Sequence, residues 1–236
     1  METTPRKPDP ALAALVGRLI GSPTLEWRHH GIGLLQAYVV QAGGGGGSEY
    51  RIHVWHPELR FVDEDSGMIH DHRFALESQV LLGAIYDTEI ELRQIGERAR
   101  VPASEPWYVM WEVENARRAA ESGEAWVRMK WPRVPKTAGS TDGMFTIQTV
   151  EHIYATGSRY SYPPRRFHRS ETKELTVTLC RKTRQVDGPA HILARVGTTP
   201  KHGIGEPMSR GYEASDPRWK HLWKASTMLM QIAREE

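Results

Sequence analysis

Two histidines, His70 and His72, stand one residue apart near the end of an extended and partly apolar segment. In a β-strand the side chains of residues i and i+2 point to the same face, so both imidazoles can approach one point in space. Neutral imidazole is the commonest side-chain ligand of transition metals. Two imidazoles alone make a weak site. The pair therefore predicts a metal site that takes one or two further ligands from elsewhere in the chain.

Two patterns of spaced residues occur in order along the chain. The first consists of Gly67, His70, His72, Glu77 and Gly83, and the second consists of Gly157, Pro163 and His168. Together they resemble the two sequence motifs of the cupin superfamily, except that Arg165 stands where the second motif has an inner glycine. Two motifs in the right order are more specific than either alone. The resemblance implies an all-β fold, the cupin-type double-stranded β-helix or jelly roll.

The resemblance also implies a set of metal ligands. It consists of His70, His72 and His168, with Glu77 as a possible fourth ligand. In a jelly roll the first motif runs through a strand, a turn and a strand, so the glutamate can return to the first two histidines. The second motif lies on a neighbouring hairpin and brings the third histidine across. Imidazole and carboxylate suit several divalent ions, so Fe(II) is the expected ion and Mn, Ni or Zn are alternatives.

Within the superfamily, the run from Ile69 to His72 is similar to the thiol dioxygenases such as cysteine dioxygenase, which hold iron(II) with three histidines. Glu77 departs from that pattern and fits equally well the three-histidine, one-glutamate cupins, such as acireductone or flavonol dioxygenases. We therefore expect a metal-dependent cupin dioxygenase whose partners are dioxygen and a small organic substrate. Two alternatives remain open: a cupin isomerase or lyase that uses the metal as a Lewis acid, and a non-catalytic ligand-binding barrel.

Three side chains near the second motif are candidate catalytic residues. Tyr160 and Tyr162 can donate hydrogen bonds to bound substrate or oxygen, and Arg165 can clamp an anionic substrate in a bidentate manner. The alternative for the tyrosines is ordinary packing in the barrel, and for the arginine a solvated charged edge. Asp71, between the first two histidines, is expected on the opposite face and is interpreted as a structural residue or as one that supports the ligands, not as a ligand.

Composition points to an ordinary globular protein. The chain has 236 residues, of which 39% are hydrophobic and 25% charged, and a formal net charge of +2. This charge is too small to predict a nucleic-acid-binding face, and no apolar run is long enough to span a membrane. A single cysteine, Cys180, cannot form an intramolecular disulfide, and the N-terminus has no secretion signal. We expect a cytoplasmic protein.

Many short alternating segments separated by Gly and Pro predict strands. They include residues 30–41, 51–55, 85–92, 107–113, 145–154, 175–180 and 191–196. Segment 85–92 alternates apolar and acidic residues, which predicts a strand with one wet face. Numerous short strands favour a barrel or sandwich, in agreement with a jelly roll.

Helices are predicted at the two ends of the chain. Residues 1–8 are polar and are expected to be a disordered tail, while Asp9 followed by Pro10 is a typical helix start. The same signal at Asp216 predicts a C-terminal helix over about 216–234, whose apolar stripe can pack on the barrel or form a homodimer. We expect residues 9–236 to be one cupin domain with an insertion at about 94–144.

Overall fold

The computed structural model describes residues 7–39, 49–62, 68–95, 106–113, 129–130, 144–198, 206–208 and 215–235. Most of these residues belong to β-strands, and helices occur near the two ends of the chain, so the all-β prediction is confirmed. Most of the expected tail at 1–8 lies outside the described residues, as does much of the expected insertion at 94–144.

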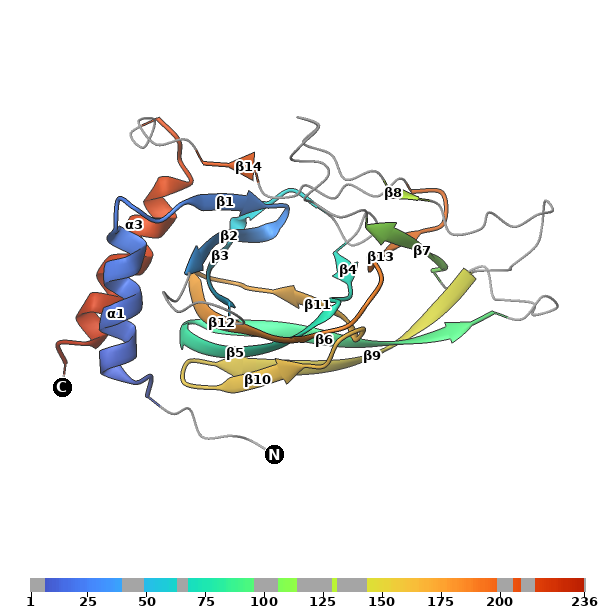
Figure 1. Cartoon of the computed structure of the whole chain (residues 1–236), viewed down its shortest axis with the longest axis horizontal. Helices are drawn as coiled ribbons and strands as arrows, with labels where there is room; N and C mark the ends of the chain where they lie inside the picture. The colour runs from blue at the N-terminus through green and yellow to red at the C-terminus, as the bar shows by residue number, and fades with distance from the viewer. Residues whose placement is uncertain are drawn as a thin grey trace.

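The strands form two antiparallel sheets that face each other (Figure 1). The first sheet has the order β10 (Arg159–Tyr162), β5 (Phe74–Leu82), β12 (Thr176–Gln185), β3 (Glu49–Arg60), β2 (Ile32–Val39), β1 (Trp27–His30) and β14 (Glu206–Pro207). The second has the order β13 (Ala190–Arg195), β4 (Ile69–His70), β11 (Phe167–Glu171), β6 (Ala84–Gln94), β9 (Met144–Ala155), β7 (Tyr108–Val113) and β8 (Met129–Lys130).

The chain alternates between the two sheets. β4 lies in the second sheet, β5 in the first and β6 in the second, and β10, β11, β12 and β13 alternate in the same way. This winding is the jelly-roll arrangement predicted from the two motifs. The strands β7 and β8, which fall within the expected insertion, extend the second sheet beside β9 and β13.

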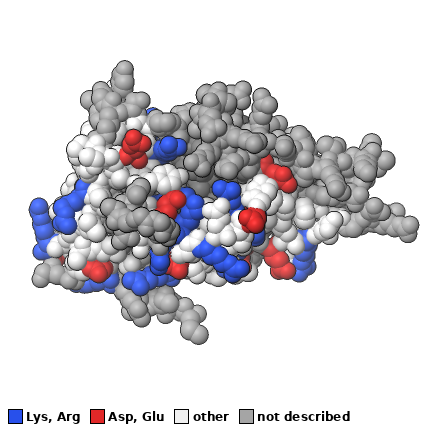
Figure 2. All heavy atoms as spheres, viewed as in Figure 1, with Lys and Arg blue, Asp and Glu red and all other residues white. Residues whose placement is uncertain are grey.

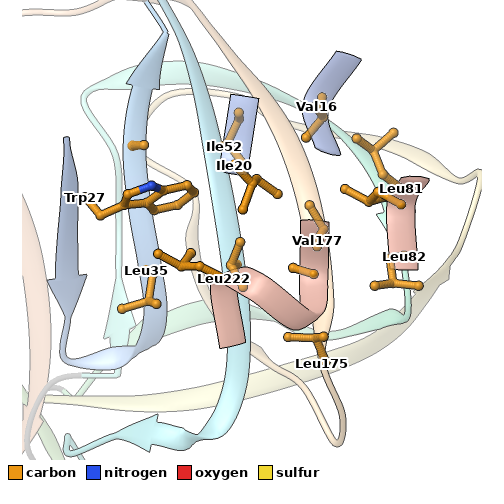
Figure 3. Packing of buried hydrophobic residues seen from close by; sticks show 14 of the residues in the cluster. Val16, Ile20, Trp27, Leu35, Ile52, Leu81, Leu82, Leu175, Val177 and Leu222 are labelled. Carbon is orange, nitrogen blue, oxygen red and sulfur yellow. The ribbon is translucent and has the colours of Figure 1, made fainter. Parts of the chain in front are cut away.

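Two helices, α1 (Pro10–Gly21) and α3 (Trp219–Ile232), lie side by side against the strands of the first sheet (Figure 1). Their buried residues form one apolar cluster with strand residues that face them. The cluster includes Val16 and Ile20 of α1, Leu222 of α3, and Trp27, Leu35, Ile52, Leu81 and Val177 of the sheet (Figure 3). The first sheet therefore has one face against the helices and the other towards the second sheet.

The helix boundaries are explained by their caps. The side chain of Asp9 accepts hydrogen bonds from the backbone N–H groups of Ala11 and Leu12 at 2.9 and 3.2 Å, as predicted. Asp216 does not cap α3. It accepts instead from the backbone and guanidinium of Arg218, and the helix begins at Trp219. We expected Trp223 on the apolar stripe of α3 together with Leu222, but Trp223 is 53% exposed, so the buried stripe is narrower than predicted.

On the face of the molecule in Figure 2, Lys and Arg side chains are interspersed with Asp and Glu side chains. Among the described residues, neither helix has the length and apolar character that crossing a membrane requires.

Candidate metal centre

Three histidines converge between the two sheets. His70 is in β4 and His168 is in β11, directly opposite it in the antiparallel register. His72 lies in the connection between β4 and β5, since β4 ends at His70. The prediction that both histidines belong to one strand is therefore wrong, although their side chains still meet. One ring nitrogen from each of the three histidines lies within 4.8 Å of the others, so they could hold a metal ion.

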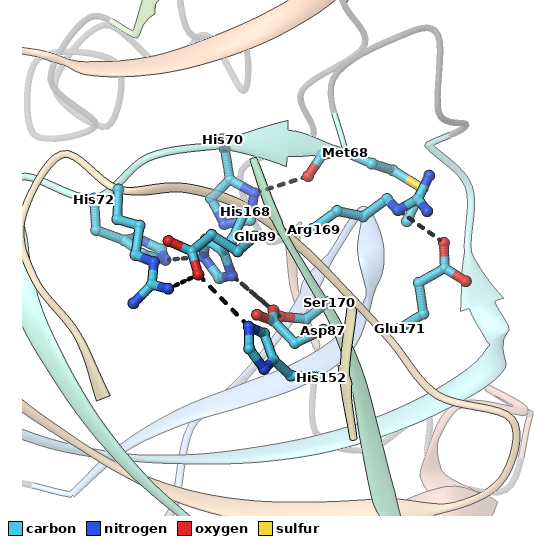
Figure 4. Close-up of polar contacts among 11 residues, drawn as sticks. Met68, His70, His72, Asp87, Glu89, His152, His168, Arg169, Ser170 and Glu171 are labelled. Atoms are coloured by element: carbon cyan, nitrogen blue, oxygen red, sulfur yellow. Dashed lines mark hydrogen bonds and ion pairs between the residues drawn. The ribbon is translucent and has the colours of Figure 1, made fainter. Parts of the chain in front are cut away.

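Hydrogen bonds on the far side of two of these rings fix their orientation (Figure 4). Nδ1 of His70 donates to the carbonyl oxygen of Met68 at 2.9 Å, and Nδ1 of His168 lies 3.1 Å from Oδ1 of Asp87. With the proton on Nδ1, each of these neutral rings carries its lone pair on Nε2. Such partners are a regular feature of metal-binding histidines, because they fix the tautomer that binds the ion.

The distances across the cluster suit a metal ion. Nε2 of His168 lies 3.1 Å from Nε2 of His72. Two lone pairs at this distance repel each other unless a proton or a cation lies between them. Imidazole nitrogens bind Zn²⁺ at about 2.0–2.1 Å, and two such ligands at about a right angle are about 3 Å apart. The donor set of three imidazoles therefore fits a divalent transition-metal ion.

Asp87 supplies negative charge next to the cluster. Its Oδ1 also accepts from the hydroxyl of Ser170 at 2.7 Å, and its side chain is almost completely buried. Burial raises the pKa of this carboxyl, but the hydrogen bonds and charge of His168, together with the hydrogen bond from Ser170, outweigh it and lower the pKa below the usual value. Asp87 is therefore an ionised carboxylate that can partly neutralise a bound cation.

The protonation state of His72 favours metal binding. Burial lowers the pKa of this imidazole well below 6.5, and the neighbouring His70 and His168 lower it further. His72 is thus neutral at pH 7. A neutral imidazole can bind a metal ion without first losing a proton.

Glu77 does not join the three histidines, which corrects the expected fourth ligand. It lies in β5 between Leu76 and Ser78, whose side chains are buried. Because side chains alternate along a strand, Glu77 points outward, where it is 56% exposed and lies 3.7 Å from the guanidinium of Arg181. Among the described residues, the ligand group contains three histidines and no carboxylate.

Tyr160 and Tyr162 of β10 both line a cavity next to the histidines. The ring of Tyr162 packs 4.2 Å from that of His168, and its hydroxyl lies near the carboxylate of Asp87. Burial raises the pKa of both phenols, and nearby Asp87 raises that of Tyr162 further. Both tyrosines therefore keep their protons and can act as hydrogen-bond donors. Their catalytic role stays a prediction.

Arg165 lies behind two residues of the cavity wall, Asp71 and His191, and its expected role in binding an anionic substrate stays a prediction. Its guanidinium donates to the backbone carbonyls of Asp187 and Pro189 and lies 3.5 Å from Asp71. The backbone of Arg165 has φ of 70°, a left-handed conformation that favours glycine. Arg165 keeps that backbone shape and uses its side chain to brace the loop before β13.

Asp71 forms a second buried pair that the sequence did not predict. It accepts from the backbone N–H of His191 at 2.6 Å and from Nδ1 of the same residue at 2.8 Å. Asp71 is not part of the three-histidine group, and its carboxylate holds His191 instead, although Asp71 lines the same cavity as the histidines. His191 lines the cavity, and its Nε2 is left as the acceptor nitrogen.

The cavity beside the histidines has a volume of about 250 Å³, which suits a small molecule. Strand β3 lines one side of it with Arg51, His53 and Trp55, while Ile52 and Val54 of the same strand face the helices. The remaining wall combines apolar and polar side chains, among them Ile32, Leu34, Gln36, Phe74, Leu76 and Cys180. The sequence shows that apolar residues alternate with other residues along β3, but this alternation does not indicate which face of the strand lines the cavity.

Comparison of the sequence with protein families and with curated proteins found no match. Among solved structures, L-ribose isomerase from Cellulomonas parahominis is similar over 76% of this chain and 85% of that chain, with 13% identity and a TM-score of 0.30. YcfD from E. coli is similar over 93% of this chain and 60% of that chain, with 8% identity and a TM-score of 0.32. Similarities this distant assign neither a family nor an activity to this chain.

Proposed function

We propose that this protein is a metal-dependent enzyme that binds one divalent ion through His70, His72 and His168 and acts on a small organic molecule. The observation that carries the proposal is the convergence of three imidazoles on the wall of a small cavity. Two of them are oriented by acceptors on their far side, and the third is neutral at pH 7. This arrangement favours a metal site over a chance group of buried histidines.

The reaction that we propose first is dioxygenation. Three neutral ligands leave the full charge of a divalent ion in place, and the open positions of such an ion, most simply Fe(II), would bind substrate and dioxygen. The absence of Glu77 from the cluster brings the ligand set closer to the three-histidine thiol dioxygenases than to the cupins with a ligating glutamate. Small thiols are therefore the first substrates to test.

The residues of the chain provide the surroundings for this chemistry. Apolar side chains such as Leu34, Trp55 and Phe74 limit the access of water to the cavity. Arg51 has its guanidinium held by Glu49 at 2.7 Å and lies over the rings of Tyr38 and Phe74. It thus presents a fixed positive charge at the cavity wall, which favours an anionic substrate.

The second candidate is an isomerase or lyase in which the ion acts only as a Lewis acid. One specific observation favours it: His191, oriented by Asp71, lies on the cavity wall with its Nε2 available to accept a proton. Proton transfer next to a polarised carbonyl is what such a reaction requires. The two candidates differ in their need for dioxygen.

The test is anaerobic loading with Fe(II), removal of excess ion, and elemental analysis of the wild type beside His70→Ala and His168→Ala. His152→Ala is the matched control, because His152 lies on β9 outside the cluster and contacts Glu89. We expect each cluster variant to lose iron that the wild type and the control retain. Full retention by either cluster variant contradicts the site.

Oxygen consumption then separates the reactions. Loaded enzyme is given a panel of small thiols and other small acids in an oxygen-electrode cell. Uptake that depends on both substrate and His168 supports dioxygenation. Turnover that continues without dioxygen supports the isomerase or lyase. Ligand binding without turnover, and unchanged in the metal-free variants, supports a non-catalytic barrel.

A further inference from the structure

A second group of residues that could hold a metal ion lies on the other face of β3. Where Arg51, His53 and Trp55 face the cavity, Ile52 and Val54 face the two helices. His56 and Glu58 follow further along the strand, two residues apart, at the point where β3 meets α3. His221, in the first turn of α3, approaches them from the helix side.

The three residues lie close enough together to bind a single ion. One ligand atom from each of the three residues lies within 4.8 Å of the others. The rings of His56 and His221 are 4.1 Å apart between centroids, and Nε2 of His221 lies 3.5 Å from Oε2 of Glu58. His221 is only 5% exposed, so its ring is fixed by its surroundings while Glu58 faces solvent.

We propose that His56, Glu58 and His221 bind a transition-metal ion of the Zn²⁺ class and that the ion joins α3 to β3. Two imidazoles and one carboxylate form a suitable donor set for Zn²⁺, with a water as the fourth ligand. This site is separate from the three-histidine cluster, and it does not depend on the function proposed for that cluster. We refer to it as the β3–α3 site.

The protonation of these residues suits a metal ion. Burial lowers the pKa of His221 to about 4 and also lowers that of His56. The nearby Lys220 and Lys224 lower both values further, while Glu58 raises them. The contact with Lys220 lowers the pKa of Glu58. At pH 7 the site therefore offers two neutral imidazoles and an ionised carboxylate.

Two contacts compete with the ion. Nζ of Lys220 donates to Oε2 of Glu58 at 2.6 Å, and the backbone N–H of Glu58 donates to Nδ1 of His56 at 3.2 Å. Binding through Nε2 of His56 moves its proton to Nδ1 and breaks the second contact. Lys220 and the positive end of the α3 dipole also repel a cation. Removal of the Lys220 charge should therefore tighten binding.

The experiment is a titration with Zn²⁺ in competition with a chromogenic chelator. The protein carries His70→Ala and His168→Ala so that the three-histidine cluster cannot contribute. We expect about one equivalent of Zn²⁺ in this background, lost when His56→Asn or Glu58→Gln is added. Lys220→Gln should lower the dissociation constant, and His152→Asn, the control, should leave it unchanged.

A second measurement uses the wild-type protein and does not depend on how the multiple variant folds. If the ion joins α3 to β3, Zn²⁺ should raise the thermal midpoint of wild type more than that of His56→Asn. His56 and Glu58 are not in the apolar core, so these variants should fold. Equal Zn²⁺ stoichiometry, or an equal rise of the midpoint, in wild type and His56→Asn would overturn the proposal.

Discussion

At His168 the two ring nitrogens have different roles. Nε2 faces the other two histidines, and Nδ1 faces Asp87 on the neighbouring strand β6. The carboxylate holds the proton on Nδ1 and thereby leaves a lone pair on Nε2. The same logic applies to His70, where a backbone carbonyl replaces the carboxylate. The ability of these residues to bind a metal therefore depends on atoms that never touch the ion.

Removal of the Asp87 charge should weaken metal binding. We expect Asp87→Asn to lower the affinity for the ion by about 10–100-fold, the usual cost of losing a carboxylate behind a metal-binding histidine. The measurement is a metal titration in competition with a chelator. Glu91→Gln is the matched control, since Glu91 is an exposed carboxylate on the same strand. Equal affinities of the Asp87 variant and the wild type would contradict the role of Asp87.

Glu77 provides the opposite test. Because its side chain points to solvent beside Arg181, we expect Glu77→Gln to retain as much metal as the wild type. Its effect on stability should also be small, at most about 1 kcal/mol, as for other exposed ion pairs. Elemental analysis of the purified variant is the measurement. Loss of metal would show that Glu77 turns inward when the ion is bound.

At the scale of elements, a single turn sets how β5 passes from the first sheet to β6 in the second. Gly83 stands at this turn with φ of 75°, and a Cβ there would meet the side chain of Thr176 and lie 2.7 Å from the carbonyl oxygen of Leu175. The turn thus needs glycine both for its backbone conformation and for the close approach of β12.

Two glycine substitutions separate these requirements. Gly83→Ala should lower the free energy of unfolding by about 2–5 kcal/mol, from the left-handed backbone and the steric conflict together. Gly197→Ala has a similar φ of 88° but nothing within 4 Å of the added Cβ, so it should cost only about 1–2 kcal/mol. Urea unfolding of both variants measures the difference. Equal losses would mean that the steric conflict is relieved at no cost.

The elements show what the sequence could and could not predict. The two motifs correctly predicted the jelly roll and the convergence of His70, His72 and His168, because the spacing within a motif reflects the lengths of its strands and turns. Glu77 was misassigned because it was placed by resemblance to the motif, whereas in β5 it lies between two buried residues and therefore points outward. Asp87 was missed because segment 85–92 was predicted to have a wet acidic face, yet Ile85 and Asp87 both point inward and are buried.

Contacts between residues far apart in the chain could not be predicted from the sequence. The pair of Asp71 and His191 joins residues 120 positions apart, and the group of His56, Glu58 and His221 joins a strand to the C-terminal helix. No local pattern encodes such distances, since they depend on how the two sheets and the helices pack together. The predicted helix start at Asp216 was wrong for a local reason. Arg218 binds the carboxylate of Asp216, which therefore does not cap α3.

At the scale of the whole molecule, buried neutral histidines make the fold sensitive to acid. His53 lies on the cavity wall and is 7% exposed, and burial together with Arg51 lowers its pKa from 6.5 to about 3. The unfolded chain therefore binds a proton at His53 before the folded chain does. The resulting contribution to stability is complete above pH 6.5 and is lost progressively as the pH falls towards 3.

This sensitivity can be measured residue by residue. Between pH 7 and pH 5 the single group at His53 should lower the free energy of unfolding by about 2 kcal/mol. His53→Gln removes this group. Between pH 7 and pH 5, the free energy of unfolding of the variant should therefore fall by about 2 kcal/mol less than that of the wild type. Urea unfolding of wild type and variant at several pH values tests the prediction. Parallel pH profiles would show that His53 is protonated equally in both states.

The position of His168 opposite His70 has one further consequence. The two residues are neighbours on adjacent strands but about a hundred positions apart in the chain. An ion shared between them acts as a removable cross-link that closes a very long loop. A covalent link around a loop of this size removes about 4.7 kcal/mol of unfolded-chain entropy. Chelation would open that loop, so the metal-free protein should be digested by proteases sooner than the metal-bound protein.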